Sequence, residues 1–362
     1  MKLIICSPMQ LPALNGTTIY ANQLSNYFKA PVIASNALDW KAVYKKGKTH
    51  NKGFRVVRNP LFNNSSLFVK FERLTKSLPL INSIIHGPLT PAMPLKLLKS
   101  DWDIVHSLTL PFYNNYIAMT AAKLKRRKCA ITPFFIKGVV PDSYSKLLKN
   151  YDLVLACTEY EKKCLNELGL RNVHVIPMSV NPKPFEKASG SRFRKTYGIS
   201  DEERIVLFVG HANLEKGAYS LLEAALRVKA RFVFMGAHTP GFKSRIKSNN
   251  VLLVNPQLKN KFDAFAACDV YAMPSRVEAF GITYLEAWAS KKPVIAADNP
   301  VSREVIGNAG LLVNFGDTNA LIKAINNSFE QKGLAGYNKL VENYSEDKVM
   351  SDYMKLLKLS LK

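Results

Sequence analysis

Acidic side chains and long apolar runs are both scarce in this sequence. Its 362 residues include 27 Asp and Glu against 51 Lys and Arg, which gives a formal net charge of +24 at pH 7. No apolar run approaches the ~20 residues that a membrane-spanning helix needs. The opening MKLIICSPMQ has too short an apolar core for a signal peptide and is typical of a first strand. We therefore expect the protein to stay in the cytoplasm.

Cysteines are few, odd in number and scattered along the chain. None of them forms a pair with the spacing of metal ligands, and the set suits reduced thiols packed in strands and helices. The sequence therefore indicates neither a zinc site nor disulfide bonds. The five cysteines are Cys6, Cys129, Cys157, Cys164 and Cys268.

The positive charge is concentrated in the first half of the chain. Residues 1–180 contain 25 Lys and Arg against 9 Asp and Glu, a net charge of +16, whereas the remainder contains 26 against 18, a net charge of +8. This imbalance favours an anionic partner such as a phospholipid surface, an anionic lipid-linked acceptor or nucleic acid. A general preference for lysine in the source organism is an alternative explanation for part of it.

Short apolar segments recur through both halves, each followed by a helical or loop segment. This alternation predicts an α/β protein with two Rossmann-like, doubly wound parallel-sheet domains that face a cleft. We expect one domain at residues 1–180, a linker rich in Pro, Gly, Ser and charge at 181–200, and a second domain at 201–344. A terminal helix at 345–362 is expected to pack back on the first domain. The segments are KLIIC, PVIA, FRVV, DIVH, CAIT, DLVLA, VHVIP, RIVLFV, RFVFM, VLLV, DVYAM, PVIAA and GLLV.

The stretch SRVEAFGITYLEAWASKKPVIAAD contains two glutamates in otherwise apolar surroundings. Glu278 falls on a loop, and Glu286 falls inside a helix that we expect to begin near Gly281, roughly 7.5 Å further along its axis. The free amides from Phe280 to Thr283 would point at an anion, and the helix dipole would attract it. A surface helix with two solvated glutamates is the alternative. The apolar neighbours argue against it, because a charge among them needs a partner or a ligand hydroxyl.

A lysine precedes the first helix of the second domain. The strand RIVLFVG runs into HANLEKGAYSLLEAALRV, which places Lys216 and Gly217 at the opening of that helix. An ammonium and helix amides could therefore meet one phosphate, although Gly217 follows the lysine and the loop is not a Walker A motif. A solvated lysine at a helix start is the alternative for this motif alone. Combined with Glu278 and Glu286 in the same domain, it indicates a phosphate-containing, hydroxyl-rich ligand.

These motifs together resemble glycosyltransferase family 4, the retaining group 1 enzymes with the two-domain GT-B fold. The resemblance rests on the two glutamates separated by seven residues and on the lysine loop, and it extends over the whole chain. The motifs are EAFGITYLE, VGHANLEKG, GLLVNFGDTNALIKAI, LNG at 14–16, DIVHS and VIPMSVNPKPF.

The resemblance implies a nucleotide-sugar site without a metal ion or a further cofactor. Lys216 would hold the donor diphosphate together with helix amides, Glu286 would take the ribose hydroxyls, and Glu278 the hydroxyls of the donor sugar; Lys216 and Glu278 are the catalytic pair. Gly16 would let the loop of the first domain approach the phosphates. The implied donor-binding set is Gly16, Gly210, His211, Lys216, Glu278, Phe280, Gly281, Ile282, Thr283 and Glu286.

Two positions depart from the family pattern. His211 stands where the family usually has an arginine on the diphosphate, which gives a weaker, pH-dependent cation. Phe134 and Phe135 stand where many members have a histidine near the donor sugar. His106 in DIVHS is expected at the acceptor side, with a core histidine at a strand end as the alternative. The DWD at 101–103 is not expected to bind metal, because it precedes a strand at the end away from the cleft.

The predicted reaction is transfer of a sugar from a nucleotide diphosphate donor to a hydroxyl acceptor with retained configuration. The acceptor is expected to be a lipid-linked or cell-envelope glycan. Residues 66–78 can form an amphipathic helix for an anionic membrane face, with an ordinary surface helix as the alternative.

Two other functions remain open, a nucleotide-sugar epimerase on the same architecture and a non-enzymatic basic binding protein. No motif for nucleic-acid recognition supports the latter, and the sequence specifies neither base nor sugar.

Overall fold

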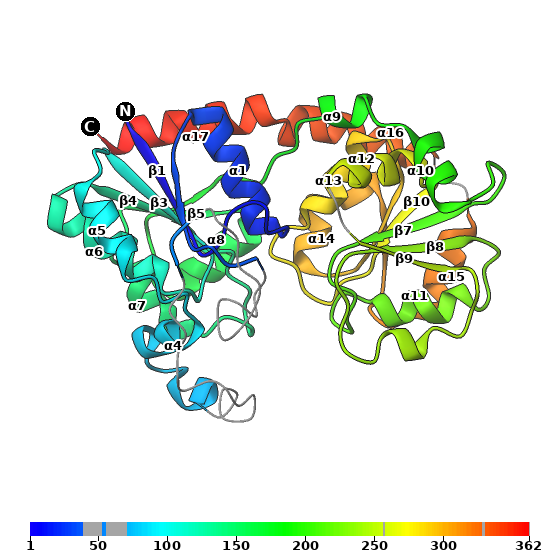
Figure 1. Cartoon of the computed structure of the whole chain (residues 1–362), viewed down its shortest axis with the longest axis horizontal. Helices are drawn as coiled ribbons and strands as arrows, with labels where there is room; N and C mark the ends of the chain where they lie inside the picture. The colour runs from blue at the N-terminus through cyan, green and yellow to red at the C-terminus, as the bar shows by residue number, and fades with distance from the viewer. Residues whose placement is uncertain (39–52, 56–70, 256–257, 328–329, 362) are drawn as a thin grey trace. The chain divides into compact units, whose positions relative to one another are not determined.

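The computed structural model describes residues 1–38, 53–55, 71–255, 258–327 and 330–361. They form two compact units: unit 1 comprises Met1–Pro177 and Met350–Lys362, and unit 2 comprises Met178–Val349. Each unit has one six-stranded parallel sheet with helices packed on its faces (Figure 1). The α/β fold class with two doubly wound sheets is therefore confirmed.

Unit 1 has the strand order β2-β1-β3-β4-β5-β6, with every pair parallel. Strands buried on both faces read as continuous apolar runs, which is why KLIIC and DLVLA were recognisable. The strands are β1 (Leu3–Ser7), β2 (Val32–Ala34), β3 (Ile104–Leu108), β4 (Lys128–Thr132), β5 (Leu153–Ala156) and β6 (Val173–Val175). The helices of eight or more residues are α1 (Gly16–Phe28), α4 (Pro79–His86), α5 (Ala92–Lys99), α6 (Asn114–Lys125) and α8 (Glu159–Glu167).

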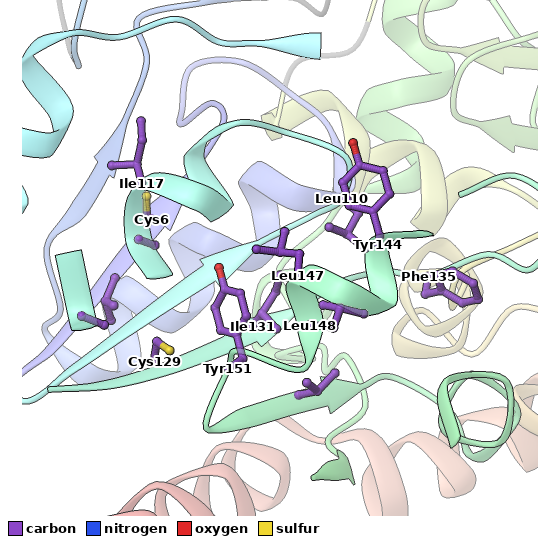
Figure 2. Close-up of a cluster of buried hydrophobic side chains, with 14 of the residues drawn as sticks. Cys6, Leu110, Ile117, Cys129, Ile131, Phe135, Tyr144, Leu147, Leu148 and Tyr151 are labelled. Carbon is purple, nitrogen blue, oxygen red and sulfur yellow. The ribbon is translucent and has the colours of Figure 1, made fainter. Parts of the chain in front are cut away.

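The core of unit 1 joins these strands to a short helical segment, η2 (Asp142–Tyr144) and α7 (Ser145–Leu148). Figure 2 shows Tyr144, Leu147 and Leu148 of this segment beside Ile131 of β4. The buried hydroxyl of Tyr151 has a partner here, since it bonds the Ser107 hydroxyl at 2.8 Å. Unit 1 therefore has an independent core of its own, as a domain requires.

Unit 2 has the strand order β12-β11-β10-β7-β8-β9, again wholly parallel. The chain leaves the central strand β7 in one direction and returns on its other side at β10, so the order reverses between these two strands. Ligands of such sheets bind outside the carboxyl ends of the strands at this reversal. The strands are β7 (Ile205–Val209), β8 (Arg231–Met235), β9 (Val251–Val254), β10 (Val270–Met273), β11 (Val294–Ala297) and β12 (Leu311–Val313).

Segments that the sequence places outside a sheet also carry structure. The expected linker 181–200 forms α9 (Lys183–Glu186) and α10 (Gly190–Tyr197), and α10 packs on α12 (Leu258–Ala267) within unit 2. The remaining helices of eight or more residues in unit 2 are α11 (Ala218–Ala225), α13 (Ile282–Ala289), α15 (Thr318–Asn326) and α16 (Glu330–Lys339).

The terminal helix α17 (Glu346–Ser360) begins in unit 2 and continues into unit 1. Val180 and Ser345 form a parallel bridge where the chain enters and leaves unit 2. Further along the helix, the buried Tyr353 contacts the ring of Phe28 in unit 1. Unit 1 is thus completed by two stretches that are distant in the sequence.

No helix in the described part of the chain is both long and apolar enough to cross a membrane. Two predicted elements fall partly outside the described residues. These are the strand FRVV, of which residues 56 and 57 are not described, and the helix at 66–78, of which residues 66–70 are not described.

Candidate functional site

The loops after β7 and β10 of unit 2 touch each other at the reversal of the strand order. Gly217, at the end of the first loop, has φ +72°, and a Cβ there would lie 2.3 Å from the carbonyl oxygen of Pro274. A side chain cannot be accommodated at that distance, so glycine lets the two loops approach. The approach of the two loops places Lys216 beside Glu278, although the two residues are 62 positions apart in the sequence.

Lys216 and Glu278, the predicted catalytic pair, form an ion pair across this contact. The Lys216 Nζ lies 2.5 Å from Glu278 Oε1, and the side chains are 31% and 8% exposed respectively. The backbone N–H of Lys216 donates to Asn213 Oδ1 at 2.8 Å, which fixes the turn that carries the lysine. The ammonium therefore keeps access to solvent, while the carboxylate is largely enclosed.

The helix α13 begins next to this ion pair. Gly281 is its N-cap with φ +86°, and a Cβ there would meet the ring of Tyr284 at 2.2 Å. No side chain of the described residues caps the helix, so the amides of Ile282 and Thr283 at its N-terminus lack a side-chain acceptor there. An uncapped helix N-terminus attracts anions through these amides and through the helix dipole. The arrangement suits a phosphate beside the Lys216 ammonium.

Neighbouring side chains of the predicted set serve packing. Phe280 is buried and its ring contacts Tyr344 edge-on, with 5.7 Å between ring centroids. The Thr283 hydroxyl accepts a bond of 2.7 Å from the Tyr271 hydroxyl. Burial raises the pKa of Tyr271 well above its ordinary value, so this donor stays neutral. These contacts brace the start of α13 against the sheet.

Glu286 is buried one turn further into α13, with 4% of its surface exposed. Its Oε1 lies 2.5 Å from the Nζ of Lys261 on α12, and its Oε2 has no hydrogen-bond partner among the described residues. Sequence reasoning missed Lys261. The available signal was its place in a helical stripe with Ala264, Phe265 and Cys268, all buried, because a lysine on an apolar face needs a partner.

Two histidines follow adjacent strands at the same edge of the sheet. His211 follows β7 and His238 follows β8, where Ala212 and His238 form a parallel bridge. Desolvation lowers the pKa of His211, and the positive charge of His238 lowers it further. His211 is exposed next to Gly210, so it can meet an anion, but mainly as a neutral ring at pH 7.

The corresponding edge of unit 1 is built from neutral groups. Asn15 caps α1 by accepting from the Thr18 N–H at 3.0 Å, and the Thr17 hydroxyl bonds the Thr109 hydroxyl, 2.8 Å away, after β3. A Cβ at Gly16 would meet no heavy atom of the described residues within 4 Å. The backbone of α1 is therefore open to an incoming group at this residue.

His106, expected at the acceptor side, is instead in the interior of unit 1. It is 0% exposed, with Nε2 2.9 Å from the Thr132 hydroxyl and Nδ1 2.8 Å from the Tyr353 hydroxyl. Burial lowers its pKa to about 3, so the ring is neutral near pH 7. The alternative of a core histidine at a strand end describes it correctly, because both ring nitrogens are occupied.

The other departures from the family pattern also have structural partners. Phe134 has φ +49°, a rare conformation for a bulky residue, and its ring packs edge-on against Tyr20. The next N–H, of Phe135, donates to the buried Glu161 carboxylate at 2.6 Å. Asp101 pairs with the Lys2 ammonium, and the described residues include no group of three or more His, Cys, Asp or Glu placed to hold a metal ion.

A family model described as "Glycosyl transferases group 1" matches residues 203–331, which include every unit 2 residue of this site. This part of unit 2 therefore resembles the group 1 glycosyl transferases. An uncharacterized 41.2 kDa protein in the cps region of Klebsiella pneumoniae is 31% identical to this chain over 186 residues, 49% of the chain and 52% of that protein. A processive diacylglycerol alpha-glucosyltransferase from Acholeplasma laidlawii is 26% identical over 183 residues, 46% of the chain and 55% of that protein.

The chain thus spans about half the length of the curated relatives it matches. Among solved structures, Anabaena HepE in complex with UDP and glucose superposes with a TM-score of 0.71, covering 99% of this chain and 100% of that one at 15% identity. At this identity the likeness shows the fold, and it confirms the GT-B fold of this chain.

Proposed function

We propose that the protein transfers a hexosyl group from a nucleotide diphosphate sugar to a hydroxyl acceptor with retention of configuration. The observation that carries this proposal is the Lys216–Glu278 ion pair at the uncapped N-terminus of α13. A diphosphate needs cations and N–H donors, and a sugar needs carboxylate acceptors for its hydroxyls. The same few residues offer both, and a solved protein of the same fold is described in complex with UDP and glucose.

The chemistry follows from where charge develops. The bond from the anomeric carbon to the phosphate oxygen breaks, and the leaving diphosphate gains negative charge. The Lys216 ammonium and the amides of Ile282 and Thr283 stabilise that charge more in the transition state than in the ground state. The acceptor hydroxyl bonds to the anomeric carbon from the face that the phosphate leaves, and its proton passes to the departing phosphate. These groups neutralise the diphosphate without a divalent ion, so no metal is required.

The ion pair also implies a step on donor binding. Glu278 already forms an ion pair with the Lys216 ammonium at 2.5 Å. An incoming diphosphate therefore competes with that carboxylate for the lysine. The donor sugar compensates, because its hydroxyls donate to Glu278 as the lysine turns to the phosphate. A nucleotide diphosphate without a sugar lacks this compensation. The pair therefore favours the complete donor over the free nucleotide product.

We further propose a lipid-linked acceptor used at an anionic membrane face. One relative is named as a diacylglycerol glucosyltransferase, and unit 1 carries an exposed apolar segment beside the exposed basic residues Arg73 and Lys76. Attachment through such a surface is expected to be electrostatic and salt-sensitive. The exposed apolar side chains are Phe71, Leu74, Leu78, Leu80 and Ile81.

Vesicle flotation tests the membrane surface. Binding to anionic but not zwitterionic vesicles, lost as salt rises, is expected. Leu74→Glu should abolish it, whereas Leu124→Glu, an equally exposed leucine on α6, should not. Equal binding to both vesicle types, or none at low salt, would instead point to an acceptor in solution.

The transfer itself is tested by incubating the protein with UDP-, GDP- and ADP-hexoses and extracted lipid-linked acceptors. Release of the nucleoside diphosphate together with an α-linked product supports the proposal. Conversion of the sugar nucleotide to its epimer without an acceptor would indicate the epimerase instead. Failure of every nucleotide sugar to bind would indicate a non-enzymatic protein.

A further inference from the structure

Two buried charges lie on facing helices just behind the candidate site. Lys261 of α12 and Glu286 of α13 approach to 2.5 Å, and their side chains are only 10% and 5% exposed. Taking two charges out of water is costly unless their hydrogen-bonding capacity is used. The contact thus needs a reason beyond the attraction between the two charges.

The hydrogen-bonding capacity of Lys261 and Glu286 is only partly used. Glu286 Oε1 accepts from Lys261, but Oε2 is buried and has no partner among the described residues. The Lys261 ammonium has three N–H donors, and among the described residues its acceptor is Glu286. A carboxylate oxygen that lacks a donor inside a protein is a strong acceptor for a hydroxyl that can reach it.

The position of the pair relates it to the nucleotide. Glu286 lies on α13 roughly 7.5 Å along the helix axis from Gly281, about the reach from a nucleotide's phosphates to its ribose. Lys261 reaches the same carboxylate from α12, a helix that is otherwise tied to α10 by the ion pair of Arg192 with Asp263.

Resting on the function proposed above, we propose that Lys261 is a positioning residue of the donor site. By engaging Oε1 it holds the plane of the Glu286 carboxylate fixed, so that Oε2 is the acceptor for one ribose hydroxyl of the nucleotide. Lys261 thereby makes the site selective for ribonucleotides, because a deoxynucleotide would leave that buried oxygen without a donor.

Calorimetry with free nucleotides tests this inference without an acceptor. UDP, GDP and ADP are titrated first, and the nucleotide that binds is compared with its 2′-deoxy and 3′-deoxy forms. We expect the wild type to bind one of the deoxy forms ~10-fold or more weakly, as the loss of a charge-assisted bond implies. In Lys261→Met that discrimination should fall below about twofold. The KM for the donor should rise while kcat at saturation changes little.

A second cycle separates positioning from stability alone. If Lys261 acts through Glu286, Lys261→Met should weaken binding further by less than about twofold in a Glu286→Gln background. Arg192→Met removes the other ion pair on α12 and should leave the ribose discrimination intact. If Lys261→Met does not fold, Lys261→Gln keeps a donor to Oε1 and should show a partial loss of discrimination.

Full discrimination in folded Lys261→Met or Lys261→Gln, or additive effects with Glu286→Gln, would make the pair a structural ion pair and overturn the inference. Binding of the ribonucleotide by the wild type in the same experiment would then leave the proposed function standing. No binding of any nucleotide by the wild type would overturn both.

Discussion

The loops at the carboxyl ends of the two sheets carry different chemical groups at equivalent positions. In unit 1 the loops after β1 and β3 meet through two neutral hydroxyls, Thr17 and Thr109. In unit 2 the loops after β7 and β10 meet through the charges of Lys216 and Glu278. Both edges follow from the same strand reversal, so the fold supplies the position and the loop residues supply the chemistry. In the function proposed above, the charged edge of unit 2 would bind the donor and the neutral edge of unit 1 would face the hydroxyl acceptor.

The largest expected effect tests the charged edge. Lys216→Ala should lower turnover by ~10²-fold or more, the order found when a preorganised charge stabiliser is removed. Steady-state kinetics with the nucleotide sugar that the transfer assay selects measures it, with Lys195→Ala on α10 as an exposed-lysine control. Unchanged turnover in a folded Lys216→Ala protein would remove this lysine from the site.

Glu278→Gln should separate nucleotide binding from turnover. The change releases the Lys216 ammonium from its counter-ion and removes a negative charge from beside the diphosphate, so free nucleoside diphosphate should bind several-fold more tightly, on the order of 1 kcal/mol. Turnover should nevertheless fall by ~10-fold or more, since the sugar hydroxyls lose a charged acceptor. Calorimetry and kinetics measure the two effects. Parallel losses in both would contradict the competition for Lys216.

Gly16→Ala tests the neutral edge of unit 1. A Cβ at Gly16 meets no heavy atom of the described residues within 4 Å, so the free energy of unfolding should change by less than about 0.5 kcal/mol. If a donor phosphate approaches this backbone, turnover should still fall by ~10-fold, because a misplacement of about 1 Å is costly in a reacting complex. Urea unfolding and kinetics together decide. Normal turnover would leave the nucleotide entirely to unit 2.

His106 gives the smallest effect on activity and a distinct one on stability. The folded protein keeps it neutral with its pKa lowered to about 3, whereas an unfolded histidine titrates near 6.5. Its contribution to stability is therefore present above pH 6.5 and is lost as pH falls toward 3, at most about 1.4 kcal/mol per pH unit. His106→Gln should flatten the unfolding profile between pH 4 and 6 and leave the donor KM unchanged. A raised KM would place this residue in the site after all.

Much of this architecture could be predicted because parallel strands buried on both faces leave short, continuous apolar runs in the sequence. Glu278 and Glu286 were also visible, as charges in apolar surroundings. The contacts of Glu286 with Lys261 and of Lys216 with Glu278 were not, because each joins residues that only the tertiary fold brings together. His106 shows that a motif near the expected site can also mislead. The motif ends a strand at that edge, but the side chain bonds in the interior to Tyr353, which is 247 residues away.

The same Tyr353 contact has a consequence for biosynthesis. Unit 2 is one continuous stretch, whereas unit 1 needs residues from 350 onward, which leave the ribosome only after all of unit 2 has been made. At 5–20 residues per second, residues 1–177 would wait roughly 10–35 s for their partner. During that time the Nδ1 of His106 and the ring of Phe28 lack Tyr353. The first unit to emerge is therefore the last to complete its core.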